Sequence, residues 1–210
     1  MSIVHVVRHG QVDNPTGILY ERLPGYHLSD LGQLMARQTA EFFSDLPITH
    51  LRCSPLERAQ ETMAPIHALF PSLPVVTDDR LTEAGNVFVG QVMGTTAHAA
   101  RSAKNWRYLV NPLRPSWGEP YAAIADRMLA GIQAAAVAAG EDQAVIVSHQ
   151  LPIWMARLRV EGRRLWHDPR KRQCSLASVT SFHFSAGLIR SISYLEPAAN
   201  LLPNRVAYGF

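Results

Sequence analysis

The stretch IVHVVRHG, residues 3 to 10, sets an apolar run rich in β-branched residues directly against an arginine and a histidine. A short, nearly continuous run of this kind is typical of a strand that is covered on both faces, as in a parallel sheet with helices on either side. Arg8 and His9 would then follow the carboxyl end of that strand. Ligands bind beyond this edge in open α/β sheets, so the sequence predicts a site there.

The rest of the chain alternates strand and helix patterns, which predicts an α/β fold. Further strands are expected in ITHLRC at 48–53, LPVVTDDRL at 73–81 and AVIVS at 144–148. Helices are expected from Ser29 to Pro47, from Ser54 onward, from Pro120 to Gly140 and over 151–160. Segments 176–184 and 188–194 are typical of a closing hairpin. We therefore expect a three-layer α/β/α domain over 1–210, with a mainly parallel sheet, an antiparallel edge and an unassigned tail at 196–210.

Three local signals refine this outline. Ser29 is the expected N-cap of its helix. Ser54 and Glu57 have the spacing of a capping box, with Pro55 at the first helical position. Residues 85–117 are weakly periodic, which favours irregular structure with one helix near 97–108 and a part in a lid.

Composition limits the classes of function. The chain has 210 residues, 47% of them hydrophobic, a formal net charge of +3 and two cysteines. So small a charge makes a nucleic-acid partner unexpected, and two cysteines are too few for a disulfide framework. Because the sequence also has no uninterrupted apolar run of membrane-spanning length, we expect a cytoplasmic protein that does not enter a membrane.

Titratable groups follow three of the expected strands: Arg8 and His9, the segment from Ser54 to Arg58, and His149. Arg58 is unusual because a cation in the first turn of a helix opposes the positive end of the helix dipole. A bound dianionic phosphoryl group, held by Arg8 and Arg58, would resolve that conflict. Pairing of Arg58 with Glu57 or Glu61 is the structural alternative.

Four segments in order resemble motifs of the histidine phosphatase superfamily, also called the phosphoglycerate mutase-like family. They are RHG at 8–10, SPLERAQET at 54–62, LTEAGNVFVGQ at 81–91 and VSHQLP at 147–152. The resemblance implies the phosphoglycerate mutase-like fold, a small phosphomonoester as substrate and a phosphohistidine intermediate. It implies neither a cofactor nor a metal.

The resemblance also implies roles for individual residues. His9 would be the nucleophile, and Arg8, Arg58 and His149 would hold the phosphoryl oxygens. Glu83 would protonate the leaving alkoxide and then activate the water that hydrolyses the intermediate.

The chain departs from the common family pattern around these residues. The usual RHGET is RHGQV here, and HGG is replaced by HQL at 149–151. Asn14 lies one residue nearer to the histidine than the usual pocket asparagine. Asn14, Arg22 of the segment ERLPG and Gln150 remain candidate substrate-binding residues.

Four alternatives stay open. Cys53 and Arg58 invite comparison with cysteine-dependent phosphatases, although the loop spacing is one residue short, and His5 with His9 could in principle begin a metal site. Within the family, a mutase would share the first half-reaction. A non-enzymatic module could use the basic residues of 157–172 to bind an acidic partner, but a solvated helix face is the plainer interpretation. Exposed tryptophans also make a homodimer conceivable.

Overall fold

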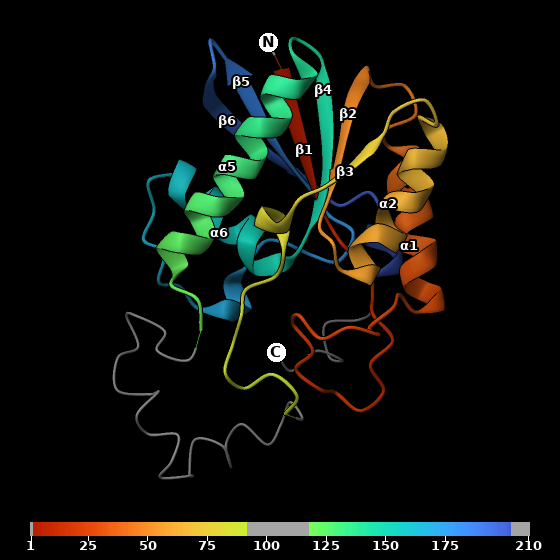
Figure 1. Ribbon diagram of the computed structural model, residues 1–210, viewed down its shortest axis with the longest axis vertical. Coiled ribbons are helices and arrows are strands. Elements are labelled where there is room, and N and C mark those ends of the chain that lie inside the picture. The colour runs from red at the N-terminus through yellow and green to blue at the C-terminus, as the bar shows by residue number, and fades with distance from the viewer. Residues whose placement is uncertain (1, 92–117, 203–210) are drawn as a thin grey trace.

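The computed structural model describes residues 2–91 and 118–202. Six strands form one sheet in the order β3-β2-β4-β1-β5-β6 (Figure 1). The strands are β1 Ser2–Arg8, β2 Ile48–Cys53, β3 Val75–Thr77, β4 Gln143–Ser148, β5 Val179–Ser185 and β6 Leu188–Leu195. The pairs β1·β4, β2·β4 and β2·β3 are parallel, whereas β1·β5 and β5·β6 are antiparallel. The mainly parallel sheet with an antiparallel edge is confirmed.

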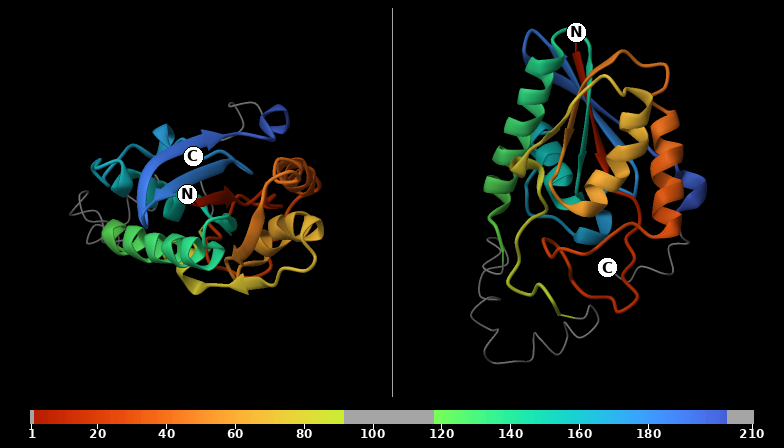
Figure 2. Two further views of the ribbon diagram at one scale, coloured as in Figure 1. Left: turned by 90° about the horizontal axis from the view of Figure 1, so that it is seen from above. Right: turned by 45° about the vertical axis from the view of Figure 1, so that its right-hand side comes forward.

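Helices cover both faces of this sheet. The α-helices are α1 Asp30–Glu41, α2 Glu57–Leu69, α5 Tyr121–Ala139 and α6 Gln150–Val160. Short 3-10 turns occur at η1 Asp79–Leu81, η3 Pro169–Lys171 and η4 Ala199–Leu201. The right-hand view of Figure 2 shows α1 and α2 on one side of the strands and α5 on the other. This is the three-layer arrangement that the alternating pattern predicts.

Alternate residues of the central strands supply the two cores. Val145 and Val147 of β4 are fully buried under α1 and α2, in a cluster with Met63. The intervening Ile146 faces the other way and packs against α5 and α6, together with Val6 of β1. Both faces of β1 and β4 are therefore dry, which explains why their sequences are nearly continuous apolar runs.

Strand register brings the three polar strand ends to one edge. Arg8 is paired with Ser148, and Cys53 with Val147. Beyond the strands, the backbone N–H of His9 donates to the Ser148 carbonyl at 3.1 Å and that of Ser54 to the Val147 carbonyl at 3.0 Å. The residues after β1, β2 and β4 are thus neighbours, as expected for the carboxyl edge of parallel strands.

Two predictions about helix ends are wrong. Helix α1 begins as expected, with the Ser29 hydroxyl accepting from the Gly32 N–H, but it ends at Glu41 instead of reaching Pro47. Helix α2 begins at Glu57 with Leu56 as an N-cap that makes no side-chain bond, so Ser54 and Glu57 form no capping box and Pro55 precedes the helix. The Ser54 hydroxyl lies before the helix, where it accepts from the Leu56 N–H at 3.4 Å and also bonds to His149.

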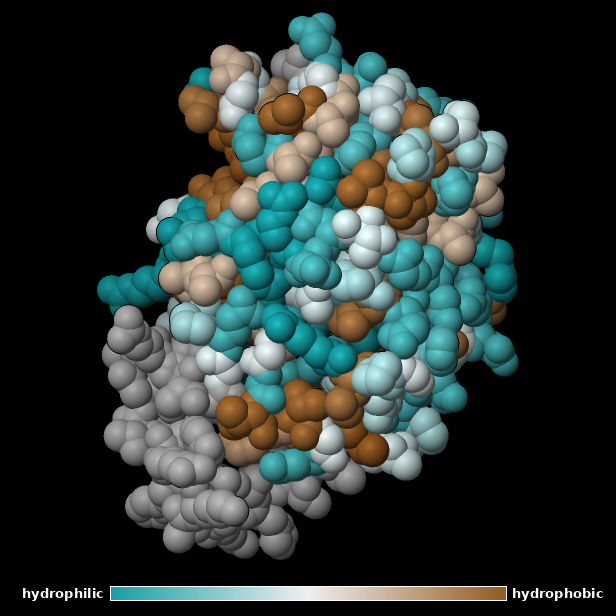
Figure 3. Space-filling model, in the orientation of Figure 1, coloured by the Kyte–Doolittle hydropathy of each residue, from teal (hydrophilic) through white to brown (hydrophobic). Residues whose placement is uncertain are grey.

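Helix α5 is the most apolar of the described helices. It has 19 residues, and an 18-residue window in it has a mean hydropathy of 1.3, so by length and composition alone it could cross a membrane. However, one side of the helix packs in the core, with Ile124, Met128 and Ile132 fully buried. Figure 3 shows hydrophilic residues in a broad band across this face of the molecule, with apolar side chains in separate patches. The core helix of a soluble protein has these same properties.

The end of the described chain packs on α1. Ala198, Leu201 and Leu202 contact Met35, and the Gln38 amide donates to the Pro197 carbonyl at 3.0 Å. The tail that had no assignment from sequence therefore contains the short turn η4. The predicted helix near 97–108, and with it most of the suggested lid, lies outside the described residues.

Candidate active site

His9 lies at the bottom of the site, directly after β1. Its side chain is buried, with 3% exposure, and Nδ1 lies 2.8 Å from the Gly10 carbonyl oxygen. A carbonyl can only accept, so Nδ1 carries the hydrogen and Nε2 of the neutral ring keeps its lone pair. Burial, followed by the charges of Arg58 and Arg8, lowers the pKa of His9 well below its ordinary value. The imidazole is therefore neutral at pH 7, as a nucleophile requires.

His149 faces His9 from the residue that precedes α6. Its Nε2 lies 2.7 Å from the Ser54 hydroxyl, and its Nδ1 is buried without a hydrogen-bond partner. Burial, then His9 and the arginines, lowers the pKa of His149 well below its ordinary value. When Ser54 donates to Nε2, the hydrogen of the neutral ring resides on Nδ1 and is left without an acceptor. His149 is thus suited to donate a hydrogen bond to a ligand rather than to act as a cation.

Arg8 and Arg58 bring two guanidinium groups to the same place. Arg58 has 1% exposure and donates from Nη2 to the Glu21 carbonyl, whereas its Nε and Nη1 are buried without a partner. Arg8 donates from Nη1 to the Cys174 carbonyl at 2.7 Å, and its Nε is likewise buried without a partner. With His149 Nδ1, four buried donor positions remain unsatisfied around His9. Buried polar groups normally have partners, so these donors indicate an absent acceptor.

Glu57 and Glu61, the alternative partners expected for Arg58 from the sequence, bind other groups. The Glu57 carboxylate accepts from the Gly25 N–H, and the Glu61 carboxylate is used by His27 and the Leu28 N–H. Neither carboxylate forms an ion pair with Arg58. All 17 acidic side chains of the sequence fall within the described residues, and none makes an ion pair with Arg8 or Arg58. A bound anion, as the sequence predicts, would balance these charges.

The loop after His9 is fastened to both helices of its face. The Gly10 N–H donates to the Thr62 hydroxyl of α2 at 3.1 Å. Gln11, one of the departures from the family pattern, accepts from the Ser29 hydroxyl through its side chain at 2.7 Å. Gly32 of α1 lies so near the loop that a Cβ there would be 2.0 Å from the Gln11 carbonyl oxygen. The first motif is therefore held by the N-terminal ends of α1 and α2.

Glu83 follows η1 and carries its carboxylate near the arginines. One carboxylate oxygen accepts from the Ala84 N–H at 2.8 Å, and its charge acts on both Arg58 and Glu21. The Glu83 backbone carbonyl accepts from Arg22 Nε at 2.6 Å. The structure thus brings Arg8, His9, Arg58, Glu83 and His149 together from four separate parts of the chain.

Asn14 and Arg22 both have hydrogen-bond partners within the protein. The Asn14 amide donates to the Ile18 carbonyl and accepts from the Ile18 N–H, which closes the loop between them. Arg22 is 47% exposed in its side chain and forms an ion pair with Glu119 at 3.0 Å. Substrate binding by either residue stays a prediction.

Two residues near the site were missed by the sequence analysis. Glu21 has a positive φ of 30°, and one of its carboxylate oxygens is buried without a partner. Burial, and next the charge of Glu83, raises the pKa of Glu21 to about 7. Arg172, which the sequence analysis grouped with surface cations, reaches the third candidate, Gln150, whose side chain accepts from it at 3.2 Å. The motif-like segment ERLPG contains Glu21 and could have indicated that it lies near the site. No local sequence pattern distinguishes Arg172 from the basic residues around it.

The structure weakens two rival sites. Cys53 is fully buried, and burial raises the pKa of its thiol, which is the opposite of what a thiolate nucleophile needs. Both ring nitrogens of His5 are used by Ser181 and Gln143. Within residues 2–91 and 118–202, no three His, Cys, Asp or Glu side chains form a group that could hold a metal ion.

Comparison with known proteins identifies the family of this chain. The model of the histidine phosphatase superfamily (branch 1) matches residues 4–194. The chain belongs to the histidine phosphatase superfamily. An uncharacterized protein of Mycobacterium tuberculosis is 50% identical over 196 residues, which cover 93% of this chain and 96% of that protein. A probable phosphatase of Schizosaccharomyces pombe is 31% identical over 124 residues, or 55% of this chain and 59% of its own length.

Solved structures show that this histidine phosphatase has the fold of its family. A phosphoserine phosphatase of Entamoeba histolytica superposes with a TM-score of 0.74 at 17% identity, covering 94% of this chain and 99% of the other. A mycobacterial glucosyl-3-phosphoglycerate phosphatase superposes with a TM-score of 0.68 at 23% identity, covering 92% and 95%. The family membership supports a phosphatase activity and confirms the expected fold.

Proposed function

We propose that this protein hydrolyses phosphomonoesters through a phosphohistidine intermediate on His9. The observation that carries the proposal is the set of four unsatisfied buried donors, on Arg8, Arg58 and His149, that surrounds a neutral imidazole. A dianionic phosphoryl group has the oxygens that these donors lack. The planar guanidinium group of arginine can donate two parallel hydrogen bonds to phosphate oxygens, and these bonds are strong because both partners are charged.

The first half-reaction is a displacement at phosphorus. The lone pair on His9 Nε2 attacks in line, so the P–N bond forms as the P–O ester bond breaks. Arg8, Arg58 and the Nδ1–H of His149 hold the equatorial oxygens and stabilise the charge that spreads over them in the transition state. Glu83 gives its proton to the leaving alkoxide, which departs as an alcohol.

The second half-reaction reverses these roles with water. Glu83, now ionised, takes a proton from a water molecule whose oxygen attacks the phosphorus of phospho-His9. The P–N bond breaks, its electron pair returns to Nε2, and inorganic phosphate leaves. The His9 Nδ1–H bond to Gly10 holds the ring orientation through both steps.

Phosphate release across a panel of phosphomonoesters tests the activity. Rapid acid-free quenching with labelled substrate tests the intermediate, because a phosphohistidine is labile to acid and stable to base. We expect labelled protein in the wild type that disappears on acid treatment. An enzyme that releases phosphate but accumulates only acid-stable phosphoprotein would refute His9 as the nucleophile.

A mutase activity is the second candidate within the family. It shares the first half-reaction but returns the phosphoryl group to a second substrate oxygen instead of to water. Isomerisation of a phosphoglycerate, primed with a bisphosphoglycerate, should be slower than phosphate release if hydrolysis is the function.

The non-enzymatic alternative has less support from the contacts. Most of the basic side chains of 157–172 already have acidic or polar partners. The ion pairs are Arg157–Glu161, Arg163–Glu161, Arg159–Asp126 and Arg170–Asp168. These pairs engage four of the seven basic side chains, so fewer of them are free to bind an acidic macromolecule, although only three carboxylates are involved and the segment keeps a net positive charge.

We also propose that the protein is located in the cytoplasm. Cys53 and Cys174 are both buried and are not joined in a disulfide. Free thiols are typical of a reducing compartment. Cell fractionation with an antibody to the native protein would test this placement.

A further inference from the structure

Arg172 is a third arginine at the edge of the phosphate pocket. It lies between η3 and β5 and is partly buried. Its Nη1 donates to the Gln150 side-chain oxygen at 3.2 Å, and the Gln150 amide donates to the Cys174 carbonyl at 3.4 Å. That same carbonyl accepts from Arg8. Arg172 is therefore joined to the pocket arginine Arg8 through one side chain and one carbonyl.

The other end of the guanidinium group is also fixed. Arg172 Nε donates to His167 Nε2 at 2.8 Å, and His167 Nδ1 donates to the Leu165 carbonyl at 2.7 Å. His167 therefore carries its hydrogen on Nδ1 and is a neutral acceptor. Burial is the main cause of the lowered pKa of His167, and Arg172 adds to it. Two rigid neutral partners thus hold the cation in place.

The Arg172 guanidinium group is not paired with a carboxylate of the described residues. Although every acidic side chain of the sequence is described, none forms an ion pair with Arg172. Burial lowers the pKa of Arg172, the charge of Glu83 acts in the opposite direction, and the charge of Arg8 lowers it further. A partly buried cation with neutral partners is costly unless an anion joins it.

Counting charges around His9 indicates how many negative charges the pocket can accept. Among the described residues, Arg8, Arg58 and Arg172 supply three positive charges without an ion-pair partner. When Glu83 is protonated, as the proposed first half-reaction requires, a phosphomonoester dianion balances only two of these charges. Resting on the proposed function, we infer that Arg172 binds a second anionic group of the substrate, a carboxylate or another phosphate on the leaving-group side. The substrate class would then be phosphomonoesters that carry a second negative charge.

Gln150 acquires a role in this arrangement. It replaces the glycine that follows the motif histidine in the common family pattern, and its side chain spans the gap between Arg172 and the Cys174 carbonyl. A glycine at this position has no atoms that could do so. Gln150 is thus a positioning residue for Arg172.

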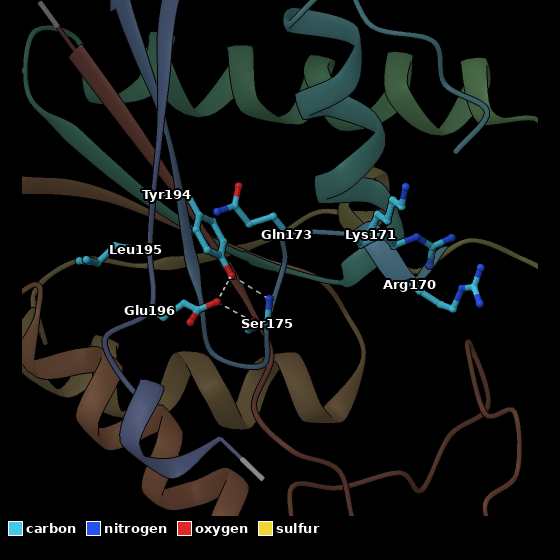
Figure 4. A pocket seen from close by; sticks show the side chains of 8 residues that line it. Arg170, Lys171, Gln173, Ser175, Tyr194, Leu195 and Glu196 are labelled. Atoms are coloured by element: carbon cyan, nitrogen blue, oxygen red, sulfur yellow. Dashed lines mark hydrogen bonds between the residues drawn. The ribbon is translucent and has the colours of Figure 1, made fainter. Parts of the chain in front are cut away.

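A nearby cavity offers the second anion a different place. It has a volume of about 570 Å³ and is lined by residues of 170–175 and 194–196, Arg172 among them. Figure 4 shows Lys171 and Arg170 on one side of it and Glu196 on the other, bonded to Tyr194 and Ser175. None of the five proposed catalytic residues lines it. Lys171 is exposed there and makes no ion pair, so it is a matched control for Arg172.

The test compares two esters that differ only in the second charge. Glycerate 3-phosphate and glycerol 3-phosphate have the same carbon chain, and 4-carboxyphenyl and phenyl phosphate form a second pair. We expect the wild type to prefer the carboxylated ester by at least about 10-fold in kcat/KM, mainly through KM. Arg172→Met should reduce this preference to about one, Arg172→Lys should retain part of it, and Lys171→Ala should leave it unchanged.

A second variant guards against misfolding of Arg172→Met. Gln150→Glu places a carboxylate beside Arg172 without changing side-chain size, so it should also remove the preference. Equal use of both esters by the wild type, or a preference that depends on Lys171 instead, would overturn the inference while leaving phosphatase activity intact.

A binding measurement tests the inference independently of catalysis. Calorimetry on His9→Ala protein, with and without Arg172→Met, measures the affinity for each ester in the absence of turnover. An affinity for the carboxylated ester that falls about 10-fold or more with Arg172→Met supports the inference even if the wild type proved inactive. An unchanged affinity refutes it.

Discussion

The rings of His9 and His149 face each other across the pocket, with centroids 5.2 Å apart and planes inclined by 57°. Both are buried, and the pKa of each lies well below its ordinary value. Two imidazoles this close cannot both be cations without strong repulsion. The pair therefore enters the reaction neutral, one ring offering a lone pair and the other an N–H.

Replacing the nucleophile gives the first prediction. His9→Ala should lower kcat by about 10⁴-fold or more and abolish the acid-labile phosphoprotein, because no other group is placed to form the P–N bond. Stopped-flow phosphate release and base-stable labelling measure the two effects. His183→Ala, on β5 beside Ile3 at the start of β1 and away from the site, should leave both unchanged. Wild-type turnover by His9→Ala would rule out the mechanism.

Ser54 provides a test of how His149 is held. Its hydroxyl fixes the hydrogen of His149 on Nδ1 through the 2.7 Å contact with Nε2. Ser54→Ala should therefore reduce kcat by about 10-fold to 100-fold, the value of one hydrogen bond to a charged ligand, and weaken vanadate binding similarly. Ser54→Thr keeps the hydroxyl and should recover most of the activity. Equal activity of Ser54→Ala and wild type would show that His149 needs no such support.

The unsatisfied donors of Arg58 predict strong stabilisation by oxyanions. At a phosphate or vanadate concentration of 100 Kd, binding to the folded state adds about 2.7 kcal/mol, or about 5 to 10 °C in Tm for a chain of this size. Arg58→Met should lose this shift. Without anion, the variant should remain within about 1 kcal/mol of the wild type, because it removes an uncompensated buried cation. Scanning calorimetry, with chloride as the reference salt, measures the Tm shift caused by the anion and the stability without it. If Arg58→Met kept the full Tm shift with phosphate, Arg58 would not be a phosphate ligand.

Glu21 predicts a pH dependence of stability. Its pKa rises from the ordinary 4.5 to about 7 in the folded protein. The protonated carboxyl is therefore favoured by folding, and the associated stability is complete below about pH 4.5 and is lost as pH rises through 7. Glu21→Gln should match the wild type near pH 4.5 and exceed it by about 1 to 2 kcal/mol at pH 8, since one pKa unit is worth about 1.4 kcal/mol and solvent screens part of it.

Glu57→Gln is the matched control for this titration. Bonds from backbone N–H groups, its own and that of Gly25, lower the pKa of Glu57. Its contribution to stability is therefore present above the ordinary pKa and lost on acidification, which is the opposite trend. Urea unfolding at pH 4.5, 6 and 8 separates the two variants. A Glu21→Gln advantage that did not grow with pH would show that Glu21 stays ionised.

Gly32 gives a prediction about the fold. A Cβ at this position would lie 2.0 Å from the Gln11 carbonyl oxygen, and backbone atoms would have to move apart. Gly32→Ala should therefore cost about 2 to 3 kcal/mol of folding free energy, despite the higher helix propensity of alanine. Leu34→Ala on the exposed side of α1 should change stability by less than about 0.5 kcal/mol. A stable Gly32→Ala protein with normal activity would show that α1 can shift away from the loop.

The sheet and the edge that carries the site could be predicted from the sequence. Runs such as IVHVV and AVIVS are apolar on both faces, and only a covered parallel strand buries both. Once these strands lie in parallel, the residues after them meet at one edge, so Arg8, His9, Arg58 and His149 could be brought together from their positions alone. These are properties of local periodicity, which a sequence displays directly.

Tertiary structure decided the contacts between distant residues. Ser54 has the spacing of a capping box, but in the structure it lies before the helix begins and its hydroxyl bonds to His149, 95 positions away. Arg172 belongs to a run of basic residues in the sequence, and only folding places it against Gln150 while leaving it without a carboxylate. Sequence determined which groups follow each strand, whereas the fold decided which donors stay unsatisfied, because hydrogen-bond partners and burial depend on packing between segments that the chain order does not show.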